Sequence, residues 1–93
     1  MSRITVRLII HGRVQGVGYR IWARSEARRL QLDGYVMNRP DGTVELVAAG
    51  PSDAVTRLMN ACRSGPSAAQ VTSVEQWDAD DEVPNGFEAR RTV

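Results

Sequence analysis

The order in which two hydrophobic periodicities follow one another along the chain limits its fold more than any other feature. Apolar residues at positions 4, 6, 8 and 10 alternate with other residues, which is typical of a strand with one buried face. From about Arg20 to Leu32, apolar residues instead recur at helical spacing, at Ala23, Ala27 and Leu30 with Trp22 beside them. Neither element can bury its apolar face alone, so the two must pack against each other in layers.

The middle of the chain predicts a hairpin followed by a second helix. A strand at 34–38 runs into the turn sequence Arg39–Gly42, and a partner strand follows at 43–49. Gly50 and Pro51 break the chain, and we expect Ser52 or Asp53 to cap the next helix. The apolar stripe of that helix consists of Val55, Leu58, Met59 and Cys62, and Ser64-Gly65-Pro66 ends it.

The last third predicts two more strands, at 71–77 and 87–93, joined by an acidic loop. The resulting order is β-α-β-β-α-β within a single domain over residues 1–93. This order predicts the α+β, ferredoxin-like fold, in which two helices cover one face of an antiparallel sheet. The same plan supports many unrelated functions, so the function has to be argued from a site.

Composition narrows the classes of partner. A net charge of +1 gives no overall attraction to nucleic acid or to an anionic membrane, so any anion site must be local. One cysteine, Cys62, excludes an internal disulfide and a multi-cysteine metal site. No leader pattern and no apolar run of membrane length is present, and nothing demands a second chain. We therefore expect a cytoplasmic monomer that binds neither nucleic acid nor membrane.

The segment from Val14 to Arg20 has the character of an anion site. It leads from a strand into a helix, yet it contains no Ser, Thr, Asp or Asn to cap the helix. Gly16 and Gly18 permit close backbone approach, and Arg20 puts a cation at the positive end of the helix dipole. These choices become favourable when an anion sits there. The spacing alone leaves open an ordinary glycine-rich loop with a solvated arginine, and it matches neither the Walker nor the dinucleotide-binding pattern.

Two motifs resemble those of a known family. Residues 12–20, Gly-Arg-Val-Gln-Gly-Val-Gly-Tyr-Arg, are similar to the acylphosphatase signature, and residues 34–45 are similar to the second motif of that family. The resemblance covers nearly the whole chain. It implies a hydrolase that cuts the carboxyl–phosphate bond of a small acyl phosphate without a metal or other cofactor.

The resemblance also implies a role for each site residue. Arg20 and Asn38 are the catalytic pair, with Asn38 holding the attacking water. The phosphoryl oxygens, or inorganic phosphate or sulfate in their place, are held by the backbone amides and the arginine of the matched loop: Gln15, Gly16, Val17, Gly18, Tyr19 and Arg20. From the strand pattern alone, Asn38 would be a residue flanking a turn, and only its pairing with the Arg20 motif indicates chemistry.

One departure from the family pattern predicts backbone strain. Gln31 stands where the family usually has glycine, at the point where the first helix must end and the chain must reverse. Helices that stop abruptly often place this residue in the left-handed region. We therefore expect Gln31 to adopt a positive φ.

Other candidate residues have simpler interpretations. His11 has no recognisable partner in the sequence, and Arg13 and Arg39 are either solvated or raise the local anion concentration. Cys62 completes an apolar stripe and reads as a buried thiol, and residues 78–82 lack the pattern of a calcium loop.

Two other functions remain open on the sequence. One is an anion-binding module of the same fold that hydrolyses nothing. The other is RNA binding, which in this fold uses aromatic residues on the central strands. That platform is missing here, because the first strand has no aromatic residue and the second has only Tyr35.

Overall fold

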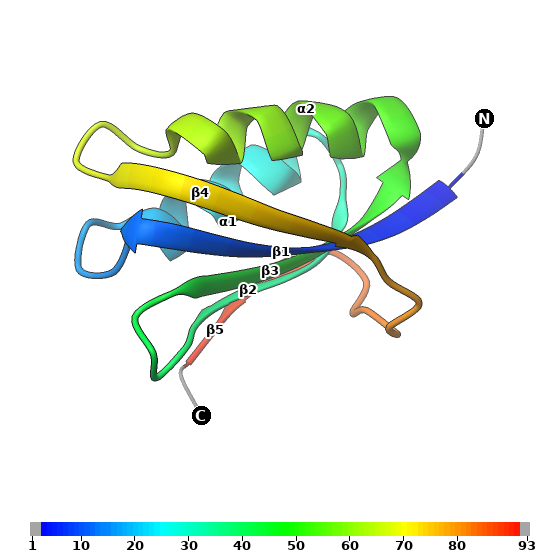
Figure 1. The fold of residues 1–93 in the computed structure, drawn as a ribbon. Helices are drawn as coiled ribbons and strands as arrows, with labels where there is room; N and C mark the ends of the chain where they lie inside the picture. Colours follow the sequence, from blue (N-terminus) through cyan, green and yellow to red (C-terminus); the bar gives the residue numbers. More distant parts are fainter. Residues whose placement is uncertain (1–2, 92–93) are drawn as a thin grey trace.

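The computed structural model describes residues 3–91. Its elements, in chain order, are β1 (Arg3–Arg13), α1 (Tyr19–Arg29), β2 (Asp33–Asn38), β3 (Val44–Pro51), α2 (Ser52–Ser64), β4 (Gln70–Asp78) and β5 (Phe87–Arg90). Figure 1 shows both helices on the same face of a single twisted sheet. The ferredoxin-like order β-α-β-β-α-β is therefore confirmed.

The sheet has the strand order β4-β1-β3-β2-β5. The pairs among β4, β1, β3 and β2 are antiparallel, as expected, but β5 pairs with β2 in parallel. This mixed sheet differs from the wholly antiparallel one expected, because β4 and β5 lie on opposite edges and residues 79–86 cross the end of the sheet between them (Figure 1). The last strand was expected to reach Val93 but ends at Arg90, and residues 92–93 lie outside the described part.

The core lies between the sheet and the two helices. The alternation in β1 turns Val6, Leu8 and Ile10 inward, as expected. From α1 the buried side chains are Tyr19, Ala23 and Ala27, and Leu30 and Trp22 are partly buried against them. From α2, Val55, Leu58 and Cys62 are buried, and Met59 packs at their margin. No helix within residues 3–91 is long and apolar enough to cross a bilayer.

The start of α2 differs from the expectation. Neither Ser52 nor Asp53 is the cap, because β3 continues through Pro51 in pairing with β1 and the helix begins directly at Ser52. Pro51 occupies the cap position with φ −57° and ψ 139°, and no side chain caps the first turn. Asp53 instead lies inside the first turn, where its carboxylate accepts a hydrogen bond from the Ala54 amide and suits the helix dipole.

The end of α1 confirms the expected strain. Gln31 has φ 58° and is the one non-glycine residue with positive φ in the described part of the chain. Its N–H donates to the carbonyl of Arg28, and the N–H of Leu32 donates to the carbonyl of Ala27, which together form a Schellman motif. The motif reverses the chain between α1 and β2.

Candidate functional site

The first turn of α1 leaves its backbone donors without partners from a side chain. Gly18 occupies the cap position in the left-handed conformation, at φ 78° and ψ 19°, and has no side chain that could cap the helix. The first hydrogen bond within the helix runs from the Trp22 N–H to the Gly18 carbonyl. The amides of Tyr19, Arg20 and Ile21 precede that bond, and no acidic residue lies in the turn. The start of α1 therefore presents several N–H groups and a positive dipole end to an anion.

The two loop glycines explain how the backbone is left accessible. Gly16 has φ 73° and Gly18 has φ 78°, conformations that cost most residues strain but not glycine. A Cβ at either position would meet nothing within 4 Å, so the loop faces open space there. Glycine is therefore needed for the backbone conformation, and the open side lets a ligand approach the amides.

Arg20 extends from this turn toward the edge of the sheet. Its Nη1 donates to the carbonyl of Arg90 in β5 at 2.9 Å, which holds the guanidinium near one position. A guanidinium has five N–H donors in one plane, so this bond leaves a fork for an anion.

Asn38, the other predicted catalytic residue, comes from the sheet. It is the last residue of β2 and is half-buried. Within residues 3–91 its side chain makes no hydrogen bond, so the amide is available to a ligand. A cavity of about 120 Å³ lies between these parts and is lined by Val14, Gly16, Gly18, Tyr19, Arg20, Ile21 and Asn38. Residues 18 positions apart in sequence, Arg20 and Asn38, thus face one small cavity.

The other residues predicted to bind phosphate do not all line this cavity. Gln15 and Val17 do not line the cavity, and the Gln15 side chain turns to the β2–β3 turn, where it donates to the carbonyls of Arg39 and Thr43. The Tyr19 side chain is buried, and its hydroxyl donates to the Cys62 carbonyl at 2.7 Å. Only the backbone of Tyr19 can therefore serve a ligand. Ile21 lines the cavity although the sequence did not single it out, and its 55% exposure is high for an isoleucine.

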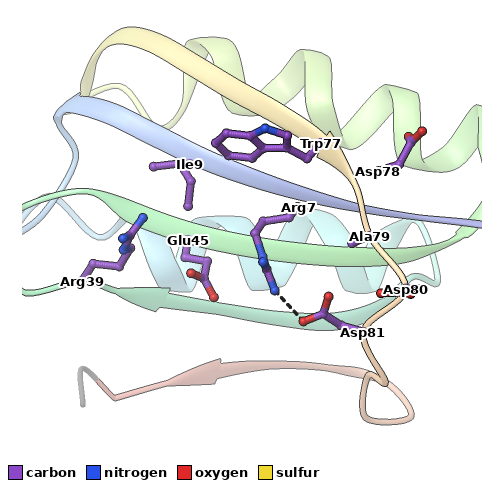
Figure 2. Close-up of a pocket in the computed structure, with 9 residues that line it drawn as sticks. All are labelled: Arg7, Ile9, Arg39, Glu45, Trp77, Asp78, Ala79, Asp80 and Asp81. Carbon is purple, nitrogen blue, oxygen red and sulfur yellow. Dashed lines mark hydrogen bonds and ion pairs between the residues drawn. The ribbon is translucent and has the colours of Figure 1, made fainter.

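A larger cavity, of about 530 Å³, lies on the face of the sheet that the helices leave uncovered. Figure 2 shows Arg7, Ile9, Glu45 and Trp77 on that face, with Arg7 pointing toward Asp81 in the segment that follows β4. Its lining contains two arginines against four carboxylates: Arg7, Arg39, Glu45, Asp78, Asp80 and Asp81. This surplus of negative charge opposes an anionic ligand, so the smaller cavity is the better anion site. Arg39 belongs to the acidic face and not to the cavity beside Asn38.

The remaining sequence candidates lie outside the cavity. His11 lies in β1 and its Nε2 contacts the Glu75 carboxylate of β4, a partner that the sequence pattern did not indicate. Arg13, the last residue of β1, is exposed and does not line the cavity. Cys62 is a buried free thiol, as expected, and its burial raises the thiol pKa to about 12, so the thiol stays protonated near neutral pH. Across residues 3–91, no three side chains of His, Cys, Asp or Glu are grouped closely enough to hold a metal ion.

Comparison with known proteins gives the family. The family model described as Acylphosphatase matches residues 6–89. An acylphosphatase of Azorhizobium caulinodans is 51% identical over 92 residues, covering 96% of this chain and 97% of that protein. One of Acidiphilium cryptum is 48% identical and covers 96% of this chain and 98% of its own length.

A solved structure agrees with these relatives. The crystal structure of an acylphosphatase from Bacillus subtilis superimposes with a TM-score of 0.89 at 35% identity, covering 94% of this chain and 98% of that one. Since the family model and these relatives cover nearly the whole chain, the chain belongs to the acylphosphatase family, whose members are hydrolases of acid anhydrides.

Proposed function

We propose that this chain hydrolyses acyl phosphates by a direct attack of water, with the phosphoryl group held at the start of α1 and the water held by Asn38. Family membership supports the overall reaction, in which an acyl phosphate and water give a carboxylate, inorganic phosphate and a proton. The observation that carries the proposed roles is that Arg20 and Asn38 line one small cavity together with the uncapped first turn of α1.

The substrate explains why so few groups suffice. A carboxylate leaves as a stable anion near neutral pH, so no general acid has to protonate it. Phosphoryl transfer passes through a loose transition state with its charge on the equatorial oxygens, and catalysis is then mainly positioning and electrostatic stabilisation. The site must therefore offer fixed donors to three oxygens and a fixed place for water.

The start of α1 has the donors for the phosphoryl oxygens. In this proposal the Arg20 fork binds two of them, and the backbone amides of residues 15–20 bind the rest. The bond from Nη1 to the Arg90 carbonyl orients the guanidinium before the substrate arrives, which reduces the reorganisation needed. In the same proposal the acyl group contacts Ile21, an exposed apolar residue that lines the cavity.

Asn38 has the group that the water needs. Its carbonyl oxygen accepts a hydrogen bond from water and so directs an oxygen lone pair toward phosphorus, in line with the leaving carboxylate. Asparagine is a poor base, but a loose transition state requires little deprotonation before the bond to phosphorus forms. The proton passes to a phosphate oxygen or to solvent as the acyl–phosphate bond breaks.

We also propose that the enzyme acts as a monomer, because one cavity within a single chain already brings Arg20 and Asn38 together. A cytoplasmic location and independence from metal ions remain part of the same proposal.

The decisive test is hydrolysis of benzoyl phosphate in the presence of a chelator, by the wild type and by Asn38→Ala. We expect the wild type to hydrolyse benzoyl phosphate. In Asn38→Ala, kcat should fall at least about 100-fold, which is the scale for removing one preorganised group. Phosphate binding, measured by calorimetry, should stay within a few-fold because Asn38 serves the water.

Each other result has a definite meaning. A wild type that binds phosphate without turnover would be an anion-binding module and not an enzyme. A variant that loses phosphate binding together with turnover would mean that Asn38 contacts the ligand directly or is structural. Restoration of activity only by added metal would contradict the metal-free mechanism.

A further inference from the structure

We infer that the side chain of Gln15 is a positioning residue that sets the distance between the phosphate-binding loop and Asn38. This role rests on the function proposed above. It differs from the role that the family resemblance implies for residue 15, which concerns the backbone amide.

The contacts of this side chain bridge two parts of the molecule that are distant in sequence. Gln15 Nε2 donates to the carbonyl of Arg39 and to the carbonyl of Thr43, each at 2.8 Å. Arg39 directly follows Asn38, and Thr43 directly precedes Val44, the residue that pairs with Asn38 in the sheet. One amide group therefore contacts both sides of the turn, directly next to the ends of the two strands. Figure 1 shows the β1–α1 loop and the β2–β3 turn at the same end of the molecule.

The hairpin closes without help from Gln15. The Arg39 N–H donates to the Thr43 carbonyl at 2.9 Å, and the Gly42 N–H donates to the Arg39 carbonyl at 3.1 Å. The Asp41 carboxylate accepts from the N–H and the hydroxyl of Thr43, and these bonds lower the pKa of Asp41. Both carbonyls thus already have a donor within the hairpin, and Gln15 uses their second lone pairs. The Gln15 bonds consequently serve the junction and not the turn itself.

The loop, in contrast, depends on this side chain for its polar connection to the hairpin. Val14 and Tyr19 are anchored in the core, while Gly16 and Gly18 between them are exposed and face open space. Among the described residues, the two Gln15 bonds are the only hydrogen bonds between residues 14–18 and residues 38–43. Without them, two glycines would give the loop freedom to shift relative to Asn38.

The reaction proposed here is sensitive to such a shift. Attack by water requires the oxygen held by Asn38 and the phosphorus held by the loop to lie in line, and a displacement of about 1 Å can cost about 100-fold in rate. Binding of phosphate requires only the loop and Arg20. A positioning role for Gln15 therefore predicts a loss in kcat without a matching loss in phosphate affinity.

The test compares Gln15→Met, which keeps the side-chain length but has no donor, with Asp41→Ala, which weakens the same turn but keeps both of the carbonyls that Gln15 contacts. In Gln15→Met we expect kcat for benzoyl phosphate to fall about 10- to 100-fold. The calorimetric dissociation constant for phosphate should stay within about 3-fold. Asp41→Ala should keep kcat within a few-fold of the wild type, even if its melting temperature falls as far as that of Gln15→Met. Gln15→Asn, which keeps the amide but is one methylene too short, is the second variant if Gln15→Met does not fold, and it should also lose kcat.

Three results would overturn the inference while the wild type remains active. These are an unchanged kcat in folded Gln15→Met or Gln15→Asn, an equal loss of kcat in Asp41→Ala, and a loss of phosphate affinity as large as the loss of kcat. A wild type that does not hydrolyse the substrate would instead overturn the proposed function, and the positioning role with it.

Discussion

The two helices of this molecule pack on the same sheet but differ at both ends. The first turn of α2 contains an acidic residue, Asp53, and the helix ends at Gly65, whose φ is 69°. The first turn of α1 contains no acidic residue and carries Arg20 instead, and the chain leaves the helix through Gln31 at φ 58°. Neither helix has a side-chain cap at its start, but the charge in the first turn and the residue that leaves the helix favour α2 and disfavour α1.

The two irregularities of α1 teach different things. At its start, α1 has no side-chain cap, and both Arg20 and the left-handed Gly18 line the cavity that contains Asn38. Features that weaken an empty helix but suit a bound anion are expected at a functional site. At its end, Gln31 lies far along the helix from that cavity, and nothing in the structure explains a glutamine there. The irregular start of α1 therefore has a proposed functional reason, whereas the strained end at Gln31 has none that the structure shows.

The largest effect that tests this comparison is the loss of activity in Arg20→Lys. Lysine keeps the positive charge at the start of α1, but an ammonium cannot provide the planar fork. It also cannot hold the Arg90 carbonyl and two phosphoryl oxygens in one plane. We expect turnover of benzoyl phosphate to fall at least about 100-fold.

The matched control stands at the start of the other helix. Asp53→Ala removes the first-turn charge of α2 and should leave turnover unchanged, since α2 takes no part in the site. If Arg20→Lys stays within a few-fold of the wild type, the charge alone matters and the fork has no role.

The next effect is stabilisation by phosphate or sulfate. If the start of α1 is completed by an anion, the folded state gains about 2.7 kcal/mol at one hundred times the dissociation constant. For a domain of this length, that corresponds to roughly 10–20 °C in melting temperature. Calorimetric melting at constant ionic strength, with chloride as the reference salt, measures it.

Two variants test whether the stabilisation by phosphate arises at the start of α1. Arg20→Ala should lose most of the stabilisation by phosphate, while Asp53→Ala should retain all of it. Equal melting temperatures in phosphate and chloride would mean that the start of α1 is not an anion site, because general screening acts through either salt.

The fold was predictable wherever the information is local in sequence. The alternation in β1 and the apolar stripe of α2 at Val55, Leu58 and Cys62 gave the correct faces, because each period depends on residues a few positions apart. The positive φ of Gln31 followed from the need to reverse the chain within a few residues. The parallel pairing of β5 with β2 could not be read in this way, since it depends on where residues 79–86 cross.

The site was predictable only in part, for the same reason. The uncapped helix start was visible in the sequence from Val14 to Arg20, but the meeting of Arg20 with Asn38 came from a resemblance and not from a pattern. The partners of two polar side chains were missed because they lie far along the chain: Gln15 reaches Arg39 and Thr43, and His11 reaches Glu75. The cap expected at Ser52 or Asp53 was wrong because pairing with β1 carries β3 through Pro51.

The smallest effect concerns the other end of α1. Gln31 stands at φ 58°, a region that costs a residue with a Cβ about 1–2 kcal/mol. Gln31→Gly removes that strain, but it also raises the entropy of the unfolded chain, which opposes the gain by roughly 0.4–1 kcal/mol. We expect a net stabilisation of about 0.5–1 kcal/mol, or roughly 2–8 °C in melting temperature. Turnover should not change, because Gln31 lies at the end of the helix away from Arg20.

The reciprocal substitution at the end of α2 is expected to have the opposite effect on stability. Gly65 has φ 69° and ψ −171°, a region that is almost confined to glycine, and a Cβ there would lie 2.8 Å from Tyr19 Cε2. Gly65→Gln should therefore destabilise the fold by at least about 1–3 kcal/mol, opposite in sign to Gln31→Gly. The hydrogen bonds of the Schellman motif at Gln31 are made by the backbone, so a glycine can keep both of them. A lower melting temperature in Gln31→Gly would then mean that the glutamine side chain itself stabilises the end of α1 by more than the left-handed backbone costs.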